Sequence, residues 1–159
     1  LIALGLVLIY ITFRFQWRQG IAAIITLLHD VMVVVGIFSI FDKEFTLPVI
    51  AALLTVVGYS LNDTIVIFDR IRENISKFRK RELLSLINQS VTETLSRTLL
   101  TSGTTLMVVL ALVFLGGEII HDFAFALLVG VLIGTYSSIY VASPTVLWLT
   151  KIAPPKTSD

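Results

Sequence analysis

The chain has 159 residues, of which 56% are hydrophobic and only 14% are charged, and its formal net charge is +1. Its mean hydropathy of +0.93 lies well above the values of soluble proteins, so we expect a membrane protein. The sequence contains no cysteine, which excludes disulfides, thiolate metal sites and thiol nucleophiles.

Apolar runs long enough to cross a bilayer follow one another along the chain. A transmembrane helix needs about 20 largely apolar residues. Four runs meet or approach this length, at residues 20–41, 46–68, 98–116 and 123–150. A fifth run, at residues 1–13, is short because the chain begins inside it without an initiator methionine. We therefore expect five crossings, the first truncated, and expect the sequence to be part of a longer protein.

The basic residues indicate which ends of these runs face the cytoplasm. If residue 1 lies on the outer side, the inner segments 14–19, 69–97 and 151–159 carry two, seven and two lysines and arginines. The outer loops then hold only Lys43. Because cytoplasmic loops of membrane proteins are enriched in basic residues, we expect a multi-pass protein of a bacterial or archaeal-type plasma membrane with its C-terminus in the cytoplasm.

The longest connection, residues 69–97, has the pattern of an amphipathic helix. Apolar residues recur there and into the next run at three- to four-residue spacing, at Leu84, Ile87, Val91, Leu95 and Leu99. This pattern predicts a cytoplasmic helix that lies along the inner membrane face and turns into the next crossing. Its basic residues suit contact with membrane lipids, and we predict no nucleic-acid partner. The expected organisation is a bundle over residues 1–153 and a cytoplasmic tail at 154–159.

Small residues stand four apart along the last run. They are Ala126, Gly130, Gly134, Ser138 and Ala142. Side chains at this spacing share one face of a helix, and small residues allow the backbones of two membrane helices to approach closely. We interpret this stripe as a packing seam with a structural role.

Polar residues interrupt the run at residues 46–68, because Asn62 and Asp63 stand before its end. A carboxylate inside a membrane helix costs about 2.5–3.5 kcal/mol, and ion pairing or protonation lowers that cost. The helix neighbours Ser60 and Thr64 place hydroxyl groups near Asp63, and these two residues, Asn62 and Thr101 are candidate relay or support residues. A carboxyl group in such surroundings can change its protonation with conformation, which is what a proton carrier requires.

Two further polar groups occupy apolar runs. Arg97 directly precedes the run at residues 98–116 and shares a helix face with Thr101. Antiparallel packing could therefore bring the charge of Arg97 beside Asp63. The alternative interpretation of Asp63 and Arg97 is a structural ion pair near the interface. His29 and Asp30 stand together near the middle of the run at residues 20–41. This pair is a candidate proton relay or a structural support.

The sequence gives little support for catalytic chemistry. It contains no glycine-rich phosphate loop, no nucleophile elbow and no histidine and carboxylate grouping with metal-ligand spacing. We therefore expect no chemical active site, no metal and no cofactor. The coupling ion is expected to be H⁺, while Na⁺ stays open because a carboxylate with hydroxyl neighbours serves either ion.

Three segments together resemble the SecF family. They are "LLHDV" at residues 27–31, "VGYSLNDTIVIFDRIREN" at 57–74 and "SRTLLTSGTTL" at 96–106, and they occur in the family's order and spacing. SecF is the smaller membrane subunit or half of the SecDF protein-export complex and resembles the resistance-nodulation-division superfamily. The resemblance implies an all-α half of six transmembrane helices, of which this chain would hold helices two to six.

The resemblance also implies a function and partners. SecDF proteins use the proton gradient to promote late stages of preprotein translocation through the SecYEG channel, so the implied partners are SecD, SecYEG and the preprotein, with YajC and YidC as further candidates. The family's proton movement involves the aspartate of its GYSxNDT motif, here Asp63, and the arginine of its SRT motif, here Arg97, with an aspartate from SecD. The family's His-Asp motif matches His29 and Asp30.

Two other functions stay open at this point. A proton-coupled exporter of lipids or small molecules from the same superfamily would use a similar intramembrane carboxylate. A purely structural assembly subunit would use Asp63 and Arg97 only to hold helices together. The second alternative predicts that neutralising both residues at once preserves function.

Overall fold

The computed structural model describes residues 17–78 and 82–152, and all regular secondary structure in these ranges is helical. Four helical stretches within them are long and apolar enough to cross a membrane, which confirms the all-α polytopic class. The expected count of five crossings is reduced to four over these residues. The expected first crossing at 1–13, the basic residues at 79–81 of the expected connection and the tail at 154–159 lie outside the described residues.

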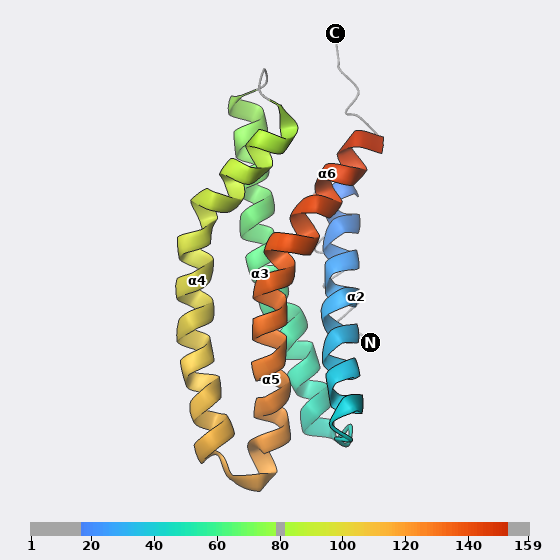
Figure 1. The fold of residues 1–159 in the computed structure, drawn as a ribbon, viewed down its shortest axis with the longest axis vertical. Helices are drawn as coiled ribbons and strands as arrows, with labels where there is room; N and C mark the ends of the chain where they lie inside the picture. Colours follow the sequence, from blue (N-terminus) through green and yellow to red (C-terminus); the bar gives the residue numbers. More distant parts are fainter. Residues whose placement is uncertain (1–16, 79–81, 153–159) are drawn as a thin grey trace.

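The helices form an up-and-down bundle with α3 and α5 at its centre (Figure 1). Their bounds are α2 Trp17–Ile40, α3 Leu47–Lys77, α4 Leu83–Leu115 and α5 Gly117–Ser137, followed by the π-helix η1 Ser138–Ala142 and α6 Ser143–Ile152. Successive long helices are antiparallel, so α3 and α5 run parallel to each other, while α2 and α4 lie on opposite sides of this pair.

The expected connection at 69–97 is a helical hairpin in the structure. Helix α3 continues to Lys77 and α4 begins at Leu83, so only residues 78–82 connect them. The polar residues explain the difference, because they bind one another across the hairpin. The buried Asn74 donates from Nδ2 to Ser90 Oγ at 2.9 Å and to Glu93 Oε2 at 3.0 Å. The amphipathic segment is thus the first part of α4 itself, and Figure 1 shows these turns slanting toward α6.

The last crossing begins earlier than the expected residue 123, because α5 starts at Gly117. Gly117 has a φ of +73°, a left-handed conformation that glycine adopts without steric cost. The chain can therefore reverse directly after α4 ends at Leu115. At the same end of the bundle, Lys43 Nζ pairs with Asp122 Oδ1 at 2.5 Å and so ties the connection after α2 to the start of α5.

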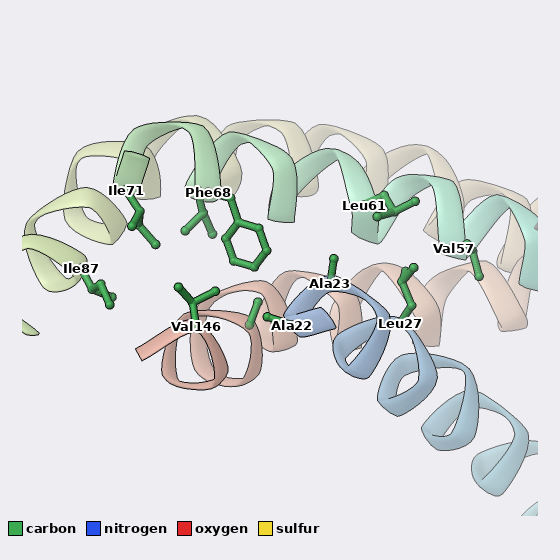
Figure 2. Packing of buried hydrophobic residues seen from close by; sticks show 11 residues of the cluster. Ala22, Ala23, Leu27, Val57, Leu61, Phe68, Ile71, Ile87 and Val146 are labelled. Atoms are coloured by element: carbon green, nitrogen blue, oxygen red, sulfur yellow. The ribbon is translucent and has the colours of Figure 1, made fainter. Parts of the chain in front are cut away.

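A buried apolar cluster fills the bundle at the end where the α3/α4 hairpin lies (Figure 2). Phe68 of α3 is fully buried and points toward Val146 of α6 and Ala22 of α2. Ile71 of α3 and Ile87 of α4 close the cluster at the hairpin end. The C-terminal part of α3 is thereby held against three other helices.

The stripe of small residues faces α3 in register. An added Cβ on Gly130 would overlap the side chain of Val56, and one on Gly134 would meet Ser60 Cβ at 3.2 Å. One step further, Ser138 Oγ lies 3.0 Å from Thr64 Oγ1, with a sequence separation of 74. The two other pairs, 130 with 56 and 134 with 60, have the same separation. This constant offset is what two parallel helices produce when matching four-residue ridges stay aligned.

The π-helix marks a bend between α5 and α6. Pro144 at the start of α6 has no N–H and its ring conflicts with the carbonyl of residue 140, which disfavours a regular α-helix there. The chain instead forms a π-helix over Ser138–Ala142, a common adjustment in kinked helices. Figure 1 shows α6 turning away from the line of α5 at this point.

The contact of Gly130 with Val56 gives a testable prediction about stability. We expect Gly130→Ala to destabilise the protein by about 1–3 kcal/mol, because valine is stiff at its branched Cβ and the helices must separate. The measurement is the melting temperature of the purified full-length protein in detergent. Gly36→Ala is the matched control, since an added Cβ there meets no atom within 4 Å.

A compensating change makes the same prediction stricter. Val56→Ala removes the two methyl carbons that lie closest to the new methyl group, so the double variant Gly130→Ala with Val56→Ala is expected to be more stable than Gly130→Ala alone. Equal melting temperatures for Gly130→Ala and Gly36→Ala would contradict the close approach of α5 and α3.

Candidate functional site

Asp63 is a buried carboxyl group in the middle of α3. Its exposed fraction is 3%. The sequence placed it a turn or two from the inner end of a helix that was expected to end at residue 68, but α3 ends at Lys77. Fourteen residues separate Asp63 from that end, which corresponds to about 21 Å of helix. Asp63 therefore lies deeper in the bundle than expected.

A cluster of hydroxyl groups from three helices surrounds Asp63. Ser102 Oγ of α4 donates a long hydrogen bond of 3.5 Å to Asp63 Oδ2. Ser102 Oγ also accepts a hydrogen bond from Tyr59 of α3 at 3.3 Å and lies 2.7 Å from Thr135 Oγ1 of α5. Asp63 is thus only weakly bonded, although its immediate neighbour Ser102 is well connected.

Arg97 acts on Asp63 through its charge and not through direct contact. Its guanidinium lies near enough for an electrostatic interaction with the Asp63 carboxyl. Among residues 17–78 and 82–152, however, no ion pair joins the two side chains. Arg97 lies instead beside a cavity of about 350 Å³ between α3 and α4, whose charged lining residues also include Asp69, Arg70, Glu73 and Glu93.

The pair His29 and Asp30 forms a second polar site. Asp30 of α2 has an exposed fraction of 1%, and its Oδ2 accepts a hydrogen bond of 2.5 Å from Ser60 Oγ of α3. His29 Nδ1 lies 3.0 Å from Asp30 Oδ1. Ser60, which the sequence placed beside Asp63, therefore serves Asp30 in the structure. Both Asp30 oxygens have a partner.

The other predicted support residues are dispersed. Thr64 is buried and contacts Ser138 at 3.0 Å. Asn62 is exposed on the outer face of α3. Thr101 Oγ1 donates to the backbone carbonyl of Arg97 at 2.9 Å and is a common case of a helix hydroxyl bonded to its own backbone. The structure thus brings neither Asn62 nor Thr101 to the Asp63 carboxyl.

Sequence reasoning missed Ser102 and Thr135. A signal for Ser102 was present, because buried hydroxyl residues recur every four positions along α4, at Ser90, Thr94, Thr98 and Ser102. This stripe contacts α3, where Ser90 meets Asn74 and Ser102 meets Asp63, and Ser102 also lies 2.7 Å from Thr135 of α5. The spacing alone does not show which helix these hydroxyl groups contact, so it could not identify Ser102 as a neighbour of Asp63.

The arrangement suits reversible protonation. A carboxyl group that has no ion pair and one weak hydrogen bond can gain or lose a proton without breaking a strong contact. The described residues contain no group of three His, Cys, Asp or Glu side chains that could hold a metal ion.

Comparisons with known proteins identify the family. The family described as "Protein export membrane protein SecD/SecF, C-terminal" matches residues 1–152. The protein translocase subunit SecF of Vibrio alginolyticus is 56% identical over 149 residues, covering 94% of this chain and 47% of that relative. The protein translocase subunit SecDF of Thermus thermophilus is 54% identical over 147 residues, covering 92% of this chain and 20% of that relative.

A solved structure has the same fold. A crystal structure of SecDF in a super-membrane-facing form matches with a TM-score of 0.87 and 53% sequence identity, covering 94% of this chain and 20% of that one. The chain spans about half the length of the SecF relatives it matches, as in the 47% covered in Vibrio alginolyticus. On these grounds, the chain belongs to the SecD/SecF family of protein export membrane proteins.

Proposed function

We propose that this chain is the membrane portion of a Sec accessory subunit that uses the proton-motive force to promote preprotein export. Asp63 is the residue that binds and releases the proton, and Arg97 biases its charge. The observation that carries the proposal is the contrast between the two buried carboxyls. Asp30 is bonded at both oxygens, whereas Asp63 has one weak bond and no ion pair among the described residues.

The energies involved fit such a role. One elementary charge that crosses 100 mV is worth about 2.3 kcal/mol. A change of charge at a weakly bonded carboxyl can shift a two-state equilibrium by a similar amount. A fully bonded carboxyl such as Asp30 would first have to break its contacts, so we assign the coupling step to Asp63 and a supporting role to His29 and Asp30.

The family membership supports the wider assembly. Relatives named SecDF contain the region matched by this chain within a longer sequence, which supports SecD as the partner of the described bundle. The SecYEG channel and the emerging preprotein complete the proposed assembly. The distribution of basic residues favours a cytoplasmic C-terminus, so the cavity beside Arg97 would open toward the cytoplasm.

Replacing Asp63 tests the proposed coupling directly. We expect Asp63→Asn to reduce preprotein release from membrane vesicles to the level seen without a proton gradient, because an amide cannot exchange a proton. The measurement compares release with and without the gradient at matched abundance of the full-length complex. Asp122→Asn is the matched control, because Asp122 is an outer carboxyl paired with Lys43 and should keep the gradient-dependent part.

The choice of ion is tested in the same vesicles. Dissipating only the proton gradient should abolish the gradient-dependent release, and dissipating only a sodium gradient should leave it intact. Full gradient-dependent release by Asp63→Asn would overturn the assignment of Asp63 as the proton carrier.

Neutralising Arg97 separates coupling from helix assembly. If Asp63 and Arg97 only hold helices together, the double variant Asp63→Asn with Arg97→Gln should regain export. We expect instead that the double variant is as inactive as Asp63→Asn, since no direct ion pair is there to be relieved. We also expect Arg97→Lys, which keeps the charge, to retain more activity than Arg97→Gln. The assay is gradient-dependent preprotein release, with abundance measured by immunoblot, and recovery in the double variant would favour the structural alternative.

A further inference from the structure

We propose that Ser102 is a positioning residue for Asp63, and that its hydroxyl forms with Tyr59 and Thr135 a hydrogen-bond switch that follows the charge of Asp63. The proposal deepens the proposed function, because it gives the weakly bonded carboxyl a means to be stabilised in either protonation state. It rests on the four oxygen atoms of these side chains, which belong to three different helices.

The proposal starts from the hydrogen-bonding capacity of a serine. A serine hydroxyl has one proton to donate and two lone pairs that accept. Around Ser102 Oγ lie Thr135 Oγ1 at 2.7 Å, the Tyr59 hydroxyl at 3.3 Å and Asp63 Oδ2 at 3.5 Å. Tyr59 donates to Ser102. The single proton of Ser102 therefore has two competing acceptors, Thr135 and Asp63.

When Asp63 is neutral, the proton of Ser102 points to Thr135. Thr135 has an acceptor for its own proton, because its Oγ1 lies 2.7 Å from the carbonyl oxygen of Val131 in its own helix. Ser102 then donates to Thr135, and its two lone pairs accept from Tyr59 and from the protonated Asp63 carboxyl. Every donor and acceptor position of Ser102 is filled.

When Asp63 is ionised, the same atoms can rearrange by hydroxyl rotation alone. Thr135 turns its proton from the Val131 carbonyl to Ser102, and Ser102 turns its proton to Asp63. Ser102 again donates once and accepts twice. The Val131 carbonyl lies within helix α5 and keeps its backbone hydrogen bond there. The rearrangement therefore leaves no buried polar group of the cluster without a partner.

The hydroxyls of Ser60 and Thr64, which lie beside Asp63 along α3, already have other partners. The Ser60 proton goes to Asp30. Ser138 donates to the Gly134 carbonyl at 2.8 Å, so Thr64 donates to Ser138 at the 3.0 Å contact between them. These bonds occupy the hydroxyls on either side of Asp63 along α3.

The charged and titratable groups around Asp63 come from the helices packed against it, and the contact that we expect to change with the charge of Asp63 is its hydrogen bond with Ser102. Tyr59 faces it from α3 and Arg97 acts on it from α4. The side chain that α5 contributes to the cluster is the neutral Thr135. On α2, Asp30 is already bonded to Ser60 and His29.

Infrared spectroscopy of the full-length complex reconstituted in liposomes tests this proposal. The carbonyl stretch of protonated Asp63 is the band that Asp63→Asn removes, and its intensity is followed against pH. Ser102→Ala should keep this band to a higher pH, by about one unit, because a donor to an anion is worth more than one to a neutral group. Ser102→Thr retains the hydroxyl and should return the titration toward that of the unaltered protein.

Ser137→Ala is the matched control. Ser137 is a buried serine of α5 whose hydroxyl donates to the Gly134 carbonyl of its own helix, so its loss should not move the titration. An unchanged titration in Ser102→Ala, or an equal shift in Ser137→Ala, would overturn the proposal. A shift in Ser102→Ala alone would support the switch even if Asp63→Asn keeps gradient-dependent export, an outcome that would refute only the proposed function.

Discussion

The close parallel contact of α5 with α3 determines the surroundings of both buried carboxyls. Small residues on α5 meet α3 with a constant separation, so Gly134 lies against Ser60 and Ser138 against Thr64. In lipid, where apolar side chains gain nothing by leaving the solvent, such packing supplies much of the association between helices. It also brings Thr135, which adjoins Gly134 in sequence, to Ser102 of α4. A bulkier α5 would remove the hydroxyl groups from the site as well as loosening the bundle.

The two buried carboxyls of the described residues, Asp30 and Asp63, differ in how fully they are hydrogen-bonded. Asp30 joins α2 to α3 through Ser60 and is bonded at both oxygens, so a change of its charge would cost the contacts of two helices. Within residues 17–78 and 82–152, Asp63 has one hydrogen bond, at the long limit of 3.5 Å. The low polarity of a helix bundle makes an underbonded carboxylate costly. A group held in that condition is sensitive to small movements of its donors, whereas a fully bonded group resists them.

Much of the fold could be predicted from the sequence, because each crossing must carry its own apolar run and satisfy its own backbone. The small-residue stripe was likewise visible, since four-residue spacing is a property of one helix. Contacts between helices were harder to predict. The sequence placed Ser60 beside Asp63 because the two are three residues apart, but the offset between α3 and α2 gives Ser60 to Asp30. The pattern at 69–97 predicts a connection and not a hairpin, because contacts across the two helices, such as that of Asn74 with Ser90, are not visible in the spacing of one segment.

The same contacts connect the site to the bend in the last crossing. Ser138 is the first residue of the π-helix and the partner of Thr64, which directly follows Asp63. Pro144 prevents this segment from returning to a regular α-helix, so the bend is built into the covalent chain. Beyond it, Val146 of α6 packs into the cluster that holds Phe68 of α3. The segment of α3 between Asp63 and Phe68 therefore contacts the start of the π-helix through Thr64 and shares a buried cluster with α6 through Phe68, so a movement of this segment would act on both ends of the bend.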